Sequence, residues 1–151
     1  MRTITVERRI EATPDRVFDL IADHAGYDRF RGIRGSELLT EGDPPPNGVG
    51  AMRRILIGPL RFDEEITAYE PPTRLDYMIK RINAPFEHQG GSIRLVAVQE
   101  GTRAEWRSTF RIPIPVRGGA VERALAPVFA RGFGRVLEDV GRMLAGSGSS
   151  S

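Results

Sequence analysis

The sequence contains no cysteine, and this absence excludes several chemistries at once. Without thiols the chain can form no disulfide, no thiolate metal site and no cysteine nucleophile. Residues 1–14 also lack the apolar core of a signal peptide, so we expect a cytoplasmic protein. No run of about 18 apolar residues occurs, and we therefore expect no membrane insertion.

Lysine is nearly absent as well, because Lys80 is the only one and almost all positive charge is arginine. The formal net charge is +2, although the pI is about 9.5. The pairs Arg8-Arg9 and Arg53-Arg54 are far apart and interleaved with acidic residues. A nucleic-acid binder usually carries a clustered basic stripe, so we expect no nucleic-acid partner.

The motifs of the common catalytic and cofactor sites are missing too. The sequence has no G-x-S-x-G, no P-loop, no G-x-G-x-x-G after a strand and no H-E-x-x-H. Its two histidines, His24 and His88, are distant and have no carboxylate at ligand spacing, which predicts no metal site. We expect no cofactor, and these absences argue against a hydrolase, kinase or dehydrogenase.

What remains has the composition of a globular protein. The 151 residues are 40% hydrophobic and 28% charged, which suits one domain with a substantial core. We expect this domain to cover residues 1–144 and residues 145–151 to form a flexible Gly/Ser tail.

Alternating apolar residues predict seven strands. We place them at 3–10, 36–41, 50–57, 61–69, 74–82, 86–98 and 102–112. Thr13-Pro14-Asp15 predicts the start of a short helix that ends near residue 24, and residues 27–30 can add another turn. Because short turns join most consecutive strands, the sheet is predicted to be antiparallel.

A long helix is predicted after Gly118-Gly119, over roughly 25 residues. Its apolar stripe consists of Val121, Leu125, Val128, Phe129, Phe133, Val136, Leu137, Val140 and Leu144. Pro127 lies inside this stripe and predicts a kink. A sheet of this length curls as its twist accumulates, and the long helix is the element able to cover its concave face. The fold class is therefore α+β, with an interior space between sheet and helix.

Three segments resemble a known family. They are IEATPDRVFDLIAD (10–23), EEITAYEPPTRLDY (64–77) and GTRAEW (101–106). In their order and spacing they resemble the START-like (SRPBCC, helix-grip) superfamily, in its polyketide cyclase/dehydrase-like subgroup, over residues 1–144. The resemblance implies a curved seven-stranded antiparallel sheet that grips a long C-terminal helix, with one or two short helices after the first strand. It also implies a hydrophobic cavity, which in relatives receives lipids, sterols, polyketides or plant hormones, and it implies no universal catalytic motif.

Strand alternation predicts which side chains line that cavity. Together with His88 near the cavity mouth and two helix residues, the expected ligand-binding set is Phe62, Glu64, Ile66, Leu75, Tyr77, Ile79, Arg81, His88, Trp106, Ser108, Phe110, Phe129 and Phe133. A buried carboxylate needs a cationic partner, and for Glu64 we expect Arg54 or Arg81. His24, at the end of the first helix, is expected to be a favourable charge for the helix C-terminus.

Three functions are compatible with these residues. A carrier or sensor of a hydrophobic metabolite needs only a cavity and a few polar anchors. A polyketide cyclase or dehydratase needs an acid–base pair as well, for which the candidates are Glu64, His88, Tyr77 and Arg81. A protein-interaction domain would need an exposed apolar groove. Each candidate also has an ordinary structural role, so the carrier or sensor is the prediction, as a monomer or a homodimer.

Overall fold

The computed structural model describes residues 1–148 of the chain. Within them the elements are β1 (Arg2–Ile10), α1 (Pro14–Ile21), the 3₁₀ helix η1 (His24–Arg29), β2 (Gly35–Thr40), β3 (Met52–Ile57), β4 (Leu60–Glu70), β5 (Arg74–Ile82), β6 (Glu87–Val98), β7 (Gly101–Arg111) and α2 (Gly118–Gly148). The predicted α+β class and the order of the elements are confirmed. None of the described helices is both long and apolar enough to cross a bilayer.

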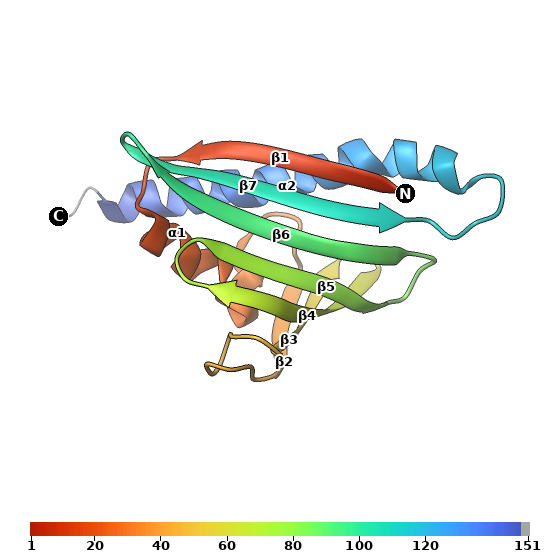
Figure 1. Cartoon of the computed structure of the whole chain (residues 1–151), viewed down its shortest axis with the longest axis horizontal. Helices are drawn as coiled ribbons and strands as arrows, with labels where there is room; N and C mark the ends of the chain where they lie inside the picture. Colours follow the sequence, from red (N-terminus) through yellow and green to blue (C-terminus); the bar gives the residue numbers. More distant parts are fainter. Residues whose placement is uncertain (149–151) are drawn as a thin grey trace.

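The seven strands form one antiparallel sheet in the order β1-β7-β6-β5-β4-β3-β2. The sheet curves so that α2 runs along its β1 and β7 side (Figure 1). The short helices α1 and η1 cover the rest, with η1 packed on β2 and β3. The core therefore lies between the concave face of the sheet and three helices.

The short helix α1 begins where the sequence predicts. The Thr13 side chain accepts a hydrogen bond from the Arg16 backbone N–H at 3.4 Å, and Pro14 occupies the first helical position. The first N–H groups of a helix have no partner within the helix. The Thr13 side chain supplies a partner for one of them, and Pro14 has no N–H group that would need one. Val17, Phe18 and Ile21 are buried, which fixes the helix against the sheet.

Two of the register shifts in the sheet bear on the candidate site residues. In β6 the register shifts between His88 and Gly90, and Gly90 has a φ of 126° that favours glycine. A glycine pair inside a strand, such as Gly90-Gly91, is typical of such a bulge. In β5 the register passes from Ile79 to Arg81, so that Lys80 is the extra residue. Nothing in the sequence marks this second bulge. Beyond it, the side chains of β5 that simple alternation would place inward face outward instead.

Helix α2 is longer than predicted and is buried unevenly. It continues through residues 145–148, which we expected in the tail, and residues 149–151 lie outside the described residues. Val136, Leu137 and Val140 in its second half are buried, whereas Val128 is 55% exposed, so its place in the apolar stripe is wrong. Pro127 lies inside the helix, and the kink expected there stays a prediction.

Candidate functional site

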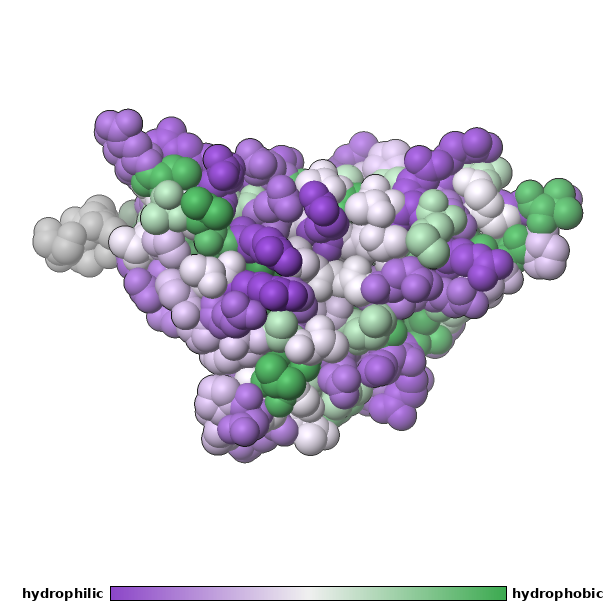
Figure 2. All heavy atoms as spheres, in the orientation of Figure 1, coloured by the Kyte–Doolittle hydropathy of each residue, from purple (hydrophilic) through white to green (hydrophobic). Residues whose placement is uncertain are grey.

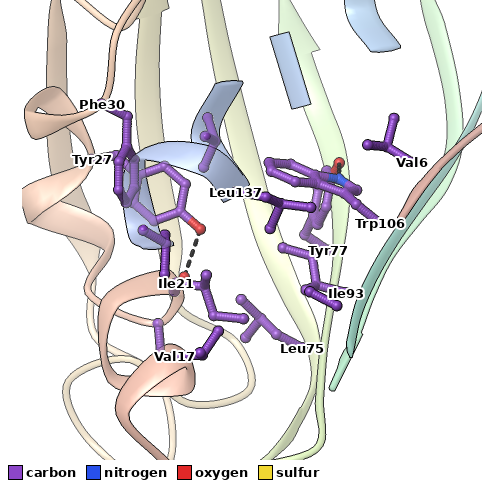
Figure 3. Close-up of a cluster of buried hydrophobic side chains, with 14 of the residues drawn as sticks. Val6, Val17, Ile21, Tyr27, Phe30, Leu75, Tyr77, Ile93, Trp106 and Leu137 are labelled. Carbon is purple, nitrogen blue, oxygen red and sulfur yellow. Dashed lines mark hydrogen bonds between the residues drawn. The ribbon is translucent and has the colours of Figure 1, made fainter. Parts of the chain in front are cut away.

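The middle of the concave face is built around Tyr77 and Trp106, which lie against each other in Figure 3. The indole Nε1–H of Trp106 donates to the Tyr77 hydroxyl at 2.8 Å. Gly91 stands opposite Tyr77 on the neighbouring strand, and a Cβ there would lie 2.2 Å from the Tyr77 ring carbon Cζ. A glycine is therefore required at this position if the tyrosine ring is to lie across β6.

Aromatic rings from the sheet and α2 meet over this centre. Trp106 stacks on Phe133 of α2 with ring centroids 4.3 Å apart. The ring of Phe110 packs on the ring of Phe86, with centroids 5.3 Å apart, and on the ring of Phe129 of α2, with centroids 5.2 Å apart. We call these five residues the aromatic wall. The sequence predicts an open cavity at this place, but the structure shows aromatic rings that contact one another and fill it.

The aromatic wall is not sealed from solvent. Phe86, Phe129 and Phe133 are only partly buried, and so are further apolar residues that pack against the core: Ile79, Ile82, Val121, Leu125, Ala126 and Ala130. A hollow of ≈ 580 Å³ opens beside Phe86, where Ile79 and Ile82 lie next to charged residues of β4 and β5. Another hollow, of ≈ 640 Å³, lies at the β6–β7 turn, away from the wall. Phe86 thus borders a hollow of the surface, and Phe129 and Phe133 on the first half of α2 keep part of their surface exposed.

A buried ion pair lies beyond Tyr77. Arg53 is 1% exposed, and its Nε donates to Glu64 Oε1 at 2.8 Å. Its guanidinium also lies 4.7 Å from the Tyr27 ring centroid and 5.2 Å from that of Tyr77. Facing aromatic rings stabilise a desolvated guanidinium, and the carboxylate balances its charge.

The prediction that Arg54 or Arg81 pairs with Glu64 was wrong. Arg54 and Arg81 both bind Asp63 on the outer face, through Nε–oxygen contacts of 2.8 and 3.2 Å. The expected inward position of Arg81 is wrong as well, because its side chain is 72% exposed after the β5 bulge. Arg53 was missed, although it alternates with the buried residues Ala51, just before β3, and Ile55, within β3, and so shares their face.

His24 is not a charged helix end but a neutral part of this cluster. It is fully buried, its Nδ1 faces Arg53 Nη1 at 3.1 Å, and its Nε2 faces the Asn47 carbonyl at 2.9 Å. Because the guanidinium can only donate, Nδ1 accepts and Nε2 carries the hydrogen. Burial, together with the charge of Arg53, lowers the pKa of His24 to about 3.

His88 lies under the aromatic wall and is also neutral. The Ile79 backbone N–H donates to its Nδ1 at 2.9 Å, which leaves Nε2–H to donate to the Ser108 hydroxyl at 2.8 Å. Its ring stacks on Tyr77 with centroids 5.4 Å apart. Burial lowers the pKa of His88 to about 4.

The other two acid–base candidates are constrained in the same way. Burial raises the pKa of Glu64, and the adjacent Arg53 charge opposes that rise. Burial, and then the Glu64 charge, raise the pKa of Tyr77, which keeps its phenol protonated at neutral pH. The inner face therefore presents neutral hydroxyl, indole and imidazole groups beside one compensated ion pair.

Most of the expected ligand-binding residues are brought together. Phe62, Ile66, Leu75, Trp106, Ser108 and Phe110 are buried on the inner face, with Ile79 partly buried beside them. Arg81 is the exception, and Arg53, His24 and Tyr27 are the additions. Which of these residues touch a ligand stays a prediction.

Comparison with known proteins agrees with this architecture. The profile of the family described as polyketide cyclase / dehydrase and lipid transport matches residues 1–142. Among the curated proteins, none matches the sequence. Among solved structures, a protein from Thermus thermophilus is similar with a TM-score of 0.80 and 20% identity, covering 97% of this chain and 99% of that chain.

Two further structures are similar in fold. A START superfamily protein from Mycobacterium smegmatis has a TM-score of 0.78 and 15% identity, covering 94% of this chain and 98% of its own. DynU16, a protein in the dynemicin biosynthetic locus, has a TM-score of 0.69 and 19% identity, covering 95% of this chain and 47% of its own. At these identities the likeness establishes the fold alone.

Proposed function

The chain belongs to the polyketide cyclase / dehydrase and lipid transport family, and on that premise we propose that it holds a small hydrophobic metabolite as a carrier or sensor. The metabolite is a lipid, a polyketide or another aromatic compound. It lies between the concave sheet and the first half of α2, against the aromatic wall.

The observation that carries this proposal is the partial burial of Phe129 and Phe133. Both rings contact sheet aromatics, yet neither is locked into the core as Leu137 is. Displacing two such rings creates apolar space without unfolding the buried second half of α2. A flat or chain-like apolar molecule that enters there contacts the sheet aromatics on one side and the two phenylalanines on the other.

Polar groups below the wall favour a ligand with a hydroxyl or carbonyl. The Tyr77 and Ser108 hydroxyls already accept hydrogen bonds from Trp106 and His88, and each retains further hydrogen-bonding capacity. Their neutral state suits a neutral oxygen more than a carboxylate or phosphate. Specificity would then come from the position of one or two oxygens on an apolar body.

The test is a titration with 1-anilinonaphthalene-8-sulfonate, a fluorescent apolar probe, on matched variants of α2. Phe129→Ser should weaken binding about tenfold, because it removes one face of the wall. Val128→Ser is the control: Val128 is the preceding residue, is 55% exposed and should leave the affinity unchanged. Equal affinities in both variants, or no binding by the wild type, would contradict the proposal. Native mass spectrometry of the purified protein can then identify a co-purified metabolite.

A cyclase or dehydratase acting in the same space is the second candidate, and the stacked Tyr77–His88–Ser108 group favours it. The imidazole of His88 can accept a proton only at Nδ1, by giving up the hydrogen bond from the Ile79 N–H, and a pKa of about 4 makes it a weak base. Once a substrate is known, His88→Ala and Glu64→Gln separate the two functions. Turnover that survives both variants while affinity falls would exclude catalysis by these residues.

A further inference from the structure

Three exposed hydrophobic side chains gather at one end of the molecule. Met1 is 72% exposed, Ile114 is 38% exposed and Val116 is fully exposed. Glu122 of α2 ties the N-terminus to the residue after β7: its Oε1 binds the N-terminal amine at 2.7 Å, and its Oε2 accepts a hydrogen bond from the Ile112 N–H at 3.1 Å. We call Met1, Ile114 and Val116 the apolar tip. Figure 2 shows hydrophobic residues at the end of the molecule where Figure 1 places the loop from β7 to α2.

The loop that carries the tip has a fixed shape. The Arg117 N–H donates to the Pro115 carbonyl at 2.7 Å, and the Gly118 N–H donates to the Ile114 carbonyl at 2.9 Å. Val116 adopts a φ of 68°, a left-handed conformation that is unfavourable for a β-branched residue. The turn therefore holds an apolar side chain in water, in a backbone conformation that glycine or asparagine would adopt more easily.

Positive charge surrounds the tip. Residues 111–123 contain Arg111, Arg117 and Arg123 and one acidic residue, Glu122. Glu122 is buried and occupied by the N-terminal amine. Arg111 lies 3.4 Å from Glu87, which leaves Arg117 and Arg123 as exposed cations beside the tip. A projecting apolar tip with arginines at its base matches a layer of anionic headgroups over hydrocarbon.

We propose that this end of the protein docks peripherally on an anionic phospholipid bilayer, with Ile114 and Val116 entering between the headgroups. A convex tip of three side chains is much smaller than a stable protein interface, which buries about 800 Å² on each partner. It is suited to a soft surface that closes around it. Because the tip leads directly into α2, docking would place the first turns of α2, with the partly buried Val121 and Leu125, near the lipid surface.

The proposal concerns other residues than the aromatic wall, so it can fail or hold independently of ligand binding. Its test is co-sedimentation with vesicles of phosphatidylcholine, with and without about one-third phosphatidylglycerol. The wild type should bind the anionic vesicles more tightly. The double variant Ile114→Ser/Val116→Ser should lose about tenfold in partition, since two apolar anchors are removed. Val96→Ser, which changes a 48% exposed valine on β6, is the control and should bind like the wild type.

Two further measurements make the result decisive. Arg117→Gln/Arg123→Gln should reduce binding to the anionic vesicles and leave the weak binding to neutral vesicles unchanged. Unaltered melting temperatures and unaltered binding of the naphthalene probe would show that the variants are folded with an intact wall. The proposal is overturned if the wild type binds neither vesicle, or if the double serine variant binds as the wild type does. It is also overturned if light scattering reveals a dimer that this variant dissociates while vesicle binding persists.

Discussion

At the scale of single residues, the two histidines connect the structure to pH. Both are buried and neutral, with a pKa of about 3 for His24 and about 4 for His88. In the unfolded chain a histidine titrates near pKa 6.5, so between these values the unfolded state binds more protons than the folded state. Stability must therefore fall as the pH falls below about 6.5.

We predict that each histidine contributes a loss of up to about 1.4 kcal/mol per pH unit between about pH 6 and pH 4.5. Urea unfolding across this range measures the slope. His24→Gln should be less stable at pH 7 and show a shallower slope, because one of the two neutral histidines is gone. A slope that does not change in this variant, or in His88→Gln, would mean that the imidazoles are protonated in the folded state.

Arg53 gives a second prediction at this scale. Replacing it by alanine leaves the Glu64 carboxylate buried without its cation and should reduce the free energy of unfolding by about 3–5 kcal/mol. The double variant Arg53→Met/Glu64→Leu removes both charges and should recover much of that loss. Thermal or urea unfolding of the three proteins decides the matter. A double variant as unstable as Arg53→Ala would show that the charge balance is not what matters there.

Strand alternation predicts the inward side chains correctly where no bulge interrupts it. Trp106, Ser108 and Phe110 were placed inside correctly because β7 has no bulge. Arg81 was misplaced since Lys80, an ordinary residue, forms the β5 bulge without any glycine to reveal it. His24 was misjudged because its burial depends on the Asn47 carbonyl, which a loop distant in sequence supplies.

At the scale of elements, the close packing of β5 against β6 depends on Gly91. We predict that Gly91→Ala destabilises the protein by about 1–3 kcal/mol, because the added methyl would overlap the Tyr77 ring. Gly132 of α2 is the matched control, since a Cβ there meets no atom within 4 Å. Gly132→Ala should stabilise by up to about 1 kcal/mol through helix propensity. Equal effects of the two substitutions on the urea midpoint would contradict this prediction.

Elements were predictable to within a residue or two at most boundaries, because turns and caps have local causes. Thr13-Pro14 begins α1 and the Gly90 bulge bends β6, each by properties of the residues themselves. The uneven burial of α2 was not predictable from its stripe. Val128 and Phe129 both follow Pro127, and only the position of the sheet decides that Phe129 packs while Val128 faces solvent.

At the scale of the whole molecule, the sequence predicted a curved sheet gripping a helix but not how its interior is filled. Seven antiparallel strands must curl, and only α2 is long enough to cover them along β1 and β7. The side chains that occupy the interior depend on ring orientations, which strand alternation does not fix. The contacts among the rings of the aromatic wall are therefore seen only in the three-dimensional structure.

The central claim, that apolar molecules enter against the aromatic wall, is tested most directly by the fluorescence of Trp106. It is the only tryptophan of the chain and stacks on Phe133, so its emission reports this one place. During titration with the naphthalene probe, we predict that Trp106 emission is quenched by energy transfer in step with the rise in probe fluorescence. We also predict that Phe133→Ala shifts the emission maximum and weakens both signals together. Probe binding that leaves Trp106 emission unchanged would place the ligand elsewhere and contradict the claim.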